Sequence, residues 1–116
     1  MKSLINNVMA VFLLLSVTLA SAQIKNAKTE TVKIYGNCEM CKKTIEKAGN
    51  LKNASKVDWN VDSKIATFTF DSTKTNQTEI VKRIAAVGYE TDQFPASNKA
   101  YNQLPKCCQY ERAAKK

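Results

Sequence analysis

Hydrophobic and polar residues alternate in three short stretches of the chain, residues 29–35, 57–61 and 65–70. A period of two residues is typical of a β-strand with one buried face. Only a few polar residues separate the second and third stretches, which predicts a β-hairpin. The three aromatic side chains of this hairpin, Trp59, Phe68 and Phe70, are expected in the core.

Two other stretches have hydrophobic residues three and four apart and are predicted to be amphipathic helices. In residues 41–48, Cys41, Ile45 and Ala48 share one face, and a Gly-Asn pair follows as a stop signal.

The second helix is predicted to begin after Asn76, an N-cap residue with Glu79 three positions later. Its buried stripe is Ile80, Ile84 and Val87, and Gly88 ends it.

Residues 89–94 are long enough for a last, short strand, so the predicted order is β-α-β-β-α-β. This order predicts an α+β, ferredoxin-like sandwich with two helices on one face of a four-stranded antiparallel sheet. The predicted domain covers residues 29–94, and residues 95–116 form a C-terminal extension.

The first 22 residues have the features of a cleavable signal peptide, with Lys2, an apolar run over residues 8–20 and an Ala-Ser-Ala site. The apolar run is shorter than the roughly 20 residues of a membrane span, although a retained anchor is the alternative. We therefore expect export to the periplasm or secretion, with no membrane anchor. Residues 23–28 are then a flexible lead-in.

The chain is basic, with 18 Lys+Arg and 10 Asp+Glu. Removal of the leader takes away only Lys2, so the net charge of the remaining chain is +7. The lysines are scattered and the protein is expected outside the cytoplasm, so nucleic acid is not the expected partner. The chain has no histidine, which removes the commonest general base and mixed Cys/His zinc sites. We expect a protein that is not an enzyme.

The candidate chemistry lies in two pairs of cysteines, Cys38 with Cys41 and Cys107 with Cys108. Four cysteines in an exported domain usually form two disulfides, but each pair here closes too short a loop to restrict the unfolded chain much. Cys41 is expected in the first helical turn, where unpaired N–H groups and nearby lysines favour the thiolate. Thiolates bind soft ions such as Cu(I) and Hg(II), and the amide of Asn37 is expected in the same loop.

Further motifs carry a family resemblance: Lys-Val-Asp at 56–58, Ala-Thr-Phe-Thr-Phe-Asp at 66–71 and Ala-Val-Gly-Tyr-Glu at 86–90. With a Cys-x-x-Cys between first strand and first helix, residues 29–94 resemble the heavy-metal-associated domain family. That family includes bacterial copper chaperones, the N-terminal domains of copper ATPases and the periplasmic mercury-binding protein. The resemblance implies that Cys38 and Cys41 bind the metal ion and that Tyr89 lies near the metal loop.

The loop departs from the family pattern at Gly36, where the family usually has a buried methionine. Met40, between the two cysteines, is expected to fill that space or to shield the metal ion.

The C-terminal extension is not part of the family fold. Adjacent cysteines rarely form a disulfide with each other, so we predict that Cys107 or Cys108 folds back to the first pair as an auxiliary ligand. A separate metal site or a mobile tail with incidental thiols are the alternatives. Tyr101 and Tyr110 are expected to pack the tail onto the sheet, and Arg112 to solvate the chain end.

The function that the sequence predicts is that of an exported chaperone for soft metal ions. It is expected to bind Cu(I) first, and Hg(II) or another thiophilic ion second. Ligand exchange then passes the ion to a membrane metal transporter or its soluble metal-binding domain. A monomer is expected, with a metal-bridged dimer as the alternative. A thiol–disulfide redox module and a disulfide-stabilised interaction domain remain open.

Overall fold

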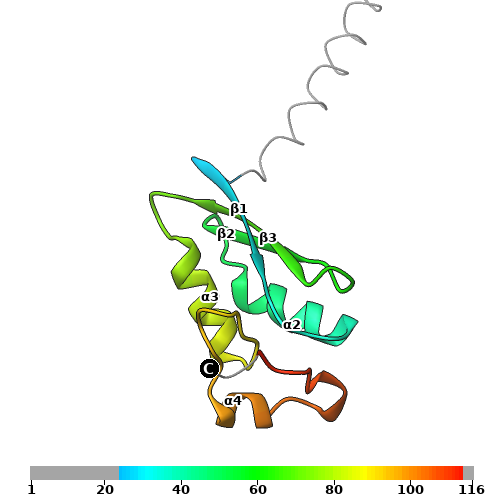
Figure 1. Ribbon diagram of the computed structural model, residues 1–116. Coiled ribbons are helices and arrows are strands. Elements are labelled where there is room, and N and C mark those ends of the chain that lie inside the picture. Colours follow the sequence, from blue (N-terminus) through cyan, green and yellow to red (C-terminus); the bar gives the residue numbers. More distant parts are fainter. Residues whose placement is uncertain (1–23, 114–116) are drawn as a thin grey trace, which may run out of the picture.

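The computed structural model describes residues 24–113, so the predicted signal peptide lies outside the described residues. The described chain has an α+β fold (Figure 1). Its elements in order are β1 (Ala27–Lys33), α2 (Glu39–Gly49), β2 (Ser55–Trp59), β3 (Ile65–Asp71), α3 (Gln77–Ala86), α4 (Asn98–Asn102) and a 3-10 helix (Lys106–Cys108). Within residues 24–113, no helix has the length and apolar character needed to cross a membrane.

The sheet has three antiparallel strands in the order β1-β3-β2. β2 and β3 form the predicted hairpin, with Val57 opposite Phe68. The side-chain oxygen of Asn60 accepts the backbone N–H groups of Asp62 and Ser63, each at 2.9 Å. The turn therefore satisfies its own backbone donors and fixes the register of the two strands.

Both long helices cover the same face of the sheet (Figure 1). Alternate residues of β3 point into the core formed there, which also contains Trp59 from β2, as predicted. The same core receives Ile45 from α2 and Ile80 and Ile84 from α3. The opposite face of β3 carries the less buried Thr67 and Thr69.

The predicted cap of the second helix is confirmed, since the Asn76 side chain accepts the backbone N–H of Glu79 at 2.9 Å. One of the three residues predicted to be buried on this helix, Val87, is not buried. Val87 is 38% exposed, because α3 ends at Ala86 and the chain has already left the helical path. Val81 is buried instead.

The predicted fourth strand is wrong: among the described residues, 89–94 form no strand of the sheet. The segment lies beside the end of β1, where the backbone N–H of Tyr35 donates to the Glu90 carbonyl at 3.0 Å. The chain then turns back on itself, because the Thr91 N–H donates to the Phe94 carbonyl and the Phe94 N–H to the Thr91 hydroxyl. These local bonds use donors that a strand would direct to its neighbour.

The C-terminal extension packs on the chain that follows α3, rather than on the sheet as predicted. The Tyr110 hydroxyl donates to the Gly88 carbonyl at 2.6 Å, and its ring lies in edge contact with that of Tyr101. Gly88 has a φ of 106°, and a Cβ there would lie 2.9 Å from the Ala100 carbonyl oxygen. Glycine therefore permits both the turn out of α3 and the close approach of the extension.

Arg112 does not solvate the chain end but ties the extension down. Its Nη2 lies 2.7 Å from Oε1 of Glu90, whose side chain is 2% exposed. The same nitrogen donates to the Ala96 carbonyl, and Nη1 donates to Asn98.

Candidate metal centre

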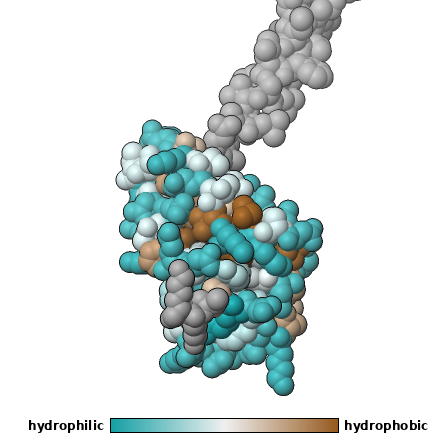
Figure 2. All heavy atoms as spheres, in the orientation of Figure 1, coloured by the Kyte–Doolittle hydropathy of each residue, from teal (hydrophilic) through white to brown (hydrophobic). Residues whose placement is uncertain are grey.

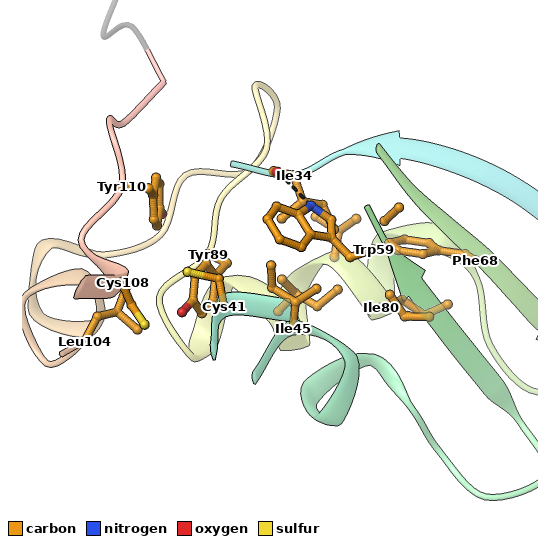
Figure 3. Packing of buried hydrophobic residues seen from close by; sticks show 14 of the residues in the cluster. Ile34, Cys41, Ile45, Trp59, Phe68, Ile80, Tyr89, Leu104, Cys108 and Tyr110 are labelled. Atoms are coloured by element: carbon orange, nitrogen blue, oxygen red, sulfur yellow. Dashed lines mark hydrogen bonds between the residues drawn. The ribbon is translucent and has the colours of Figure 1, made fainter. Parts of the chain in front are cut away.

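The loop between β1 and α2 rests on the indole ring of Trp59. The indole N–H donates to the Ile34 carbonyl at 3.0 Å, and a Cβ on Gly36 would lie 3.0 Å from the ring (Figure 3). The ring therefore lies where Met40 was expected, and Met40 itself is 52% exposed. Glycine at 36 is the residue that lets the ring approach the loop.

Cys38 and Cys41 lie at the start of α2, with Cys38 as the N-cap and Cys41 buried in the first turn. Their sulfur atoms are 3.1 Å apart. The Cys41 thiol also lies 3.1 Å from Oδ1 of Asn37, to which it donates. All four cysteines are free thiols.

The extension brings a third sulfur to this pair. Cys108 is buried, and its Sγ lies 3.6 Å from Sγ of Cys38. The sulfur atoms of Cys38, Cys41 and Cys108 all lie within 4.8 Å of one another. Figure 3 shows Cys41 and Cys108 together at one end of the core, close to Tyr89.

Cys107 points away from this three-thiol site. It is exposed, and its Sγ lies 3.7 Å from Sδ of Met40 and 3.8 Å from Sγ of Cys108. Of the two adjacent cysteines, Cys108 thus faces the first pair, and Cys107 faces the surface.

The pKa values of Cys38 and Cys108 shift in opposite directions. Burial by itself raises the pKa of Cys38, but the thiol and backbone N–H of Cys41 and the thiol of Cys108 more than offset it, and the pKa is lowered. Burial is the main reason why the pKa of Cys108 rises to about 12. The nearby lysines were expected to favour the thiolate, but Lys42 is directed to β2, where its ammonium donates to Asp58 and to the Trp59 carbonyl.

Tyr89 lies beside Cys41 and Cys108, and its buried hydroxyl has no hydrogen-bond partner among the described residues. Its ring stacks on that of Tyr110, with the centroids 5.5 Å apart. Burial raises its pKa, and the neighbouring thiols of Cys41 and Cys108 raise it further. Buried hydroxyl groups are rarely left without a hydrogen-bond partner. We therefore expect one of the neighbouring thiols to accept a hydrogen bond from Tyr89 in a functional state of the site.

The fold is similar to that of the CopZ metallochaperone. The two chains are 23% identical with a TM-score of 0.52, and the match covers 55% of this chain and 98% of CopZ. Nearly half of this chain therefore has no counterpart in CopZ. No family model and no curated protein sequence matches the chain. Membership of the heavy-metal-associated family thus stays a prediction, although the fold agrees with it.

Sequence reasoning missed three residues that position the site: Trp59 beneath the loop, Tyr110 against Tyr89, and Arg112 on Glu90. Trp59 was expected in the core, but its contact with Gly36 was not. The aromatic and basic residues that surround the second cysteine pair were the available signal for a docked extension.

Proposed function

We propose that the protein binds one thiophilic metal ion, Cu(I) first and Hg(II) second, and passes it to a partner protein. Cys38 and Cys41 are the primary ligands, and Cys108 is the third. The observation that carries this proposal is the convergence of these three sulfur atoms within 4.8 Å, with two of the three cysteines buried.

The size of the cluster suits a metal ion. With a metal–sulfur bond of about 2.3 Å, three sulfurs around one ion lie about 4.0 Å apart, and two in line lie about 4.6 Å apart. The sulfur–sulfur distances from Cys38 are 3.1 Å to Cys41 and 3.6 Å to Cys108, so modest side-chain rotations admit the ion. Three sulfur donors suit Cu(I) better than Zn(II), whose structural sites have four ligands.

The unpaired hydroxyl of Tyr89 supports the same interpretation. When the ion binds, the thiols of the cluster lose their protons and become thiolates, which accept hydrogen bonds more strongly than thiols do. The Tyr89 hydroxyl is placed to donate to such a thiolate at Cys41 or Cys108. The Tyr89 hydroxyl thus gains a hydrogen-bond acceptor when the ion binds.

Transfer follows from the same coordination chemistry. An incoming thiolate of the partner displaces one of the three sulfurs, which leaves with a proton from solvent. Repeating this exchange moves the ion to the partner with no change of oxidation state. Since no bond in a substrate is made or broken, the protein is not an enzyme.

The setting of this function comes from the sequence. The predicted leader favours an exported protein, in the periplasm or secreted, that delivers the ion to a membrane metal transporter or its soluble domain. The solved CopZ is described as a metallochaperone, which supports a carrier role. The net positive charge of the chain suits an acidic docking partner, and hydrophilic residues dominate the face shown in Figure 2.

The test is anaerobic purification of the chain from Gln23, followed by Cu(I) titration against a competing chelator and X-ray absorption on the loaded protein. We expect one Cu(I) per chain with three sulfur neighbours in the wild type and two in Cys108→Ser. Cys38→Ser/Cys41→Ser should abolish tight binding, and Asn102→Ser, an exposed change in the extension, serves as the control.

Wild-type protein that binds no stoichiometric Cu(I) contradicts the proposal. If that protein also reduces a peptide disulfide, the thiol–disulfide redox module replaces it. Stable disulfides in the exported protein point to the interaction domain instead.

A further inference from the structure

We propose that Met40 and Cys107 form an exposed exchange subsite through which the metal ion enters and leaves the buried three-thiol site. This inference rests on the proposed function and adds the route that the ion takes. Its starting observation is the contact between the two side chains, with Sδ of Met40 3.7 Å from Sγ of Cys107.

The two side chains lie at the outer end of a continuous row of sulfur atoms. Sγ of Cys107 is 3.8 Å from Sγ of Cys108, which is 3.6 Å from Sγ of Cys38. Each step is shorter than the separation of about 4.0 to 4.6 Å between two sulfurs that share one ion. An ion can therefore pass along the row while it keeps at least one sulfur ligand throughout.

Burial explains why such a route is needed. Among residues 24–113, Cys41 and Cys108 are buried and Cys38 is half-buried, whereas Met40 and Cys107 are exposed. A bulky partner or chelator reaches the exposed sulfurs first. Met40 is also free for this role, because Trp59 already occupies the space beside Gly36.

The chemistry of the pair suits transient binding of Cu(I). The thioether of methionine is a soft but uncharged ligand, and the thiolate of cysteine is soft and charged. One thiolate with one thioether holds Cu(I) more weakly than three thiolates do, so the buried site remains the resting position.

The exchange balances in ligands and protons. Cys107 loses a proton as it takes the ion from the donor together with Met40. Cys108, Cys38 and Cys41 then each lose a proton as they bind the ion, while Met40 leaves and Cys107 is protonated again. The ion stays Cu(I) throughout, and release is the reverse sequence.

The decisive experiment measures rates. Stopped-flow absorbance follows Cu(I) transfer from the loaded protein to a chromogenic chelator, and uptake from a weaker Cu(I) complex, for wild type, Met40→Leu, Cys107→Ser and the double variant. An exchange subsite lowers the barrier without changing the end states, so both rates of the double variant should fall by about tenfold or more. Asn102→Ser should transfer at the wild-type rate, since it lies in the extension and outside the sulfur row.

A structural readout accompanies the rates. Ag(I), which does not change its oxidation state, stands in for Cu(I) in a titration of protein labelled with ¹³C at the methionine methyl groups. We expect the Met40 methyl resonance to shift when the second equivalent is added, and this shift should be lost in Cys107→Ser.

Two results are distinguishable. Double-variant rates equal to those of the wild type, in protein that still binds one Cu(I), overturn the exchange subsite and leave the proposed function intact. If the wild type binds no Cu(I) in the equilibrium titration, the proposed function itself fails before any rate is compared.

Discussion

Replacing Arg112 by methionine is expected to release the C-terminal extension from the core. The guanidinium pairs with Glu90 at 2.7 Å and donates to the Ala96 carbonyl at 2.6 Å and to Asn98 at 2.7 Å. Methionine keeps part of the aliphatic stem but none of these donors. The buried carboxylate of Glu90 then has no cationic partner among residues 24–113.

The size of the effect follows from the burial of the pair. Removing one partner of a buried ion pair typically destabilises a protein by about 3–5 kcal/mol. The loss here is smaller, because the Arg112 side chain is 19% exposed. Glu90 also still accepts the backbone N–H groups of Ala96 at 3.1 Å and Ala113 at 2.9 Å. We therefore expect a loss of about 2–3 kcal/mol.

Two measurements test this expectation. Urea unfolding gives the free energy of unfolding, and native-state hydrogen exchange reports on amides of the extension, such as those of Leu104, Cys108 and Tyr110. Lys106→Met is the matched control, because it removes an exposed cation of the same segment for which no ion pair is seen in residues 24–113. If Arg112→Met unfolds within about 0.5 kcal/mol of wild type and of this control, the ion pair does not hold the extension and the reasoning is wrong.

Three further predictions concern the site, the core and pH. Tyr89→Phe should lower Cu(I) affinity about tenfold or more in a chelator competition, since a hydrogen bond to a thiolate is lost; equal affinity would contradict this. Gly49→Ala should lower the free energy of urea unfolding by about 1–3 kcal/mol, because its Cβ would lie 2.3 Å from Cγ2 of Val57. Although burial raises the pKa of Glu90, Arg112 and backbone N–H groups lower it below its usual value, so its contribution is present above pH 4.5. The free energy of urea unfolding should therefore fall as the pH is lowered below 4.5 in the wild type, and it should fall much less in Glu90→Gln.

The parts of the fold that the sequence predicted well depend on local rules. The alternation of hydrophobic and polar residues identified β3, because one of its faces must be covered, and a short polar turn identified the β2–β3 hairpin. The Asn76 cap was predictable because the bond to Glu79 involves residues three apart.

The last predicted strand failed because of one contact that is distant in the sequence and one local turn. Residues 89–94 have the length of a strand, but Glu90 is held by Arg112, 22 residues further along the chain. Thr91 and Phe94 satisfy each other within a turn. A pattern of alternation carries no information about either contact, so tertiary structure decided against the strand.

The candidate site divides in the same way. The pairing of Cys38 with Cys41 could be predicted from the sequence, because the two residues are three positions apart at the predicted start of a helix. The approach of Cys108 to Cys38 joins residues 70 positions apart and depends on how the extension docks. The choice between Cys107 and Cys108 could not be made without the 3-10 helix at Lys106–Cys108, which directs one thiol inward and the other outward.

Docking of the extension bears directly on how the ion is released. A ligand tethered to the same chain acts at an effective concentration in the millimolar range, far above that of a dilute partner protein. Cys108 therefore competes with the partner's thiolate for as long as the extension stays docked. Displacement of the Cys108 sulfur from the ion is thus a necessary step of transfer under the proposed function, whether the ion leaves directly or through Met40 and Cys107. The pair of Arg112 with Glu90 keeps that sulfur in place. The contacts that complete the three-thiol site are then the same contacts that set how readily the ion leaves it.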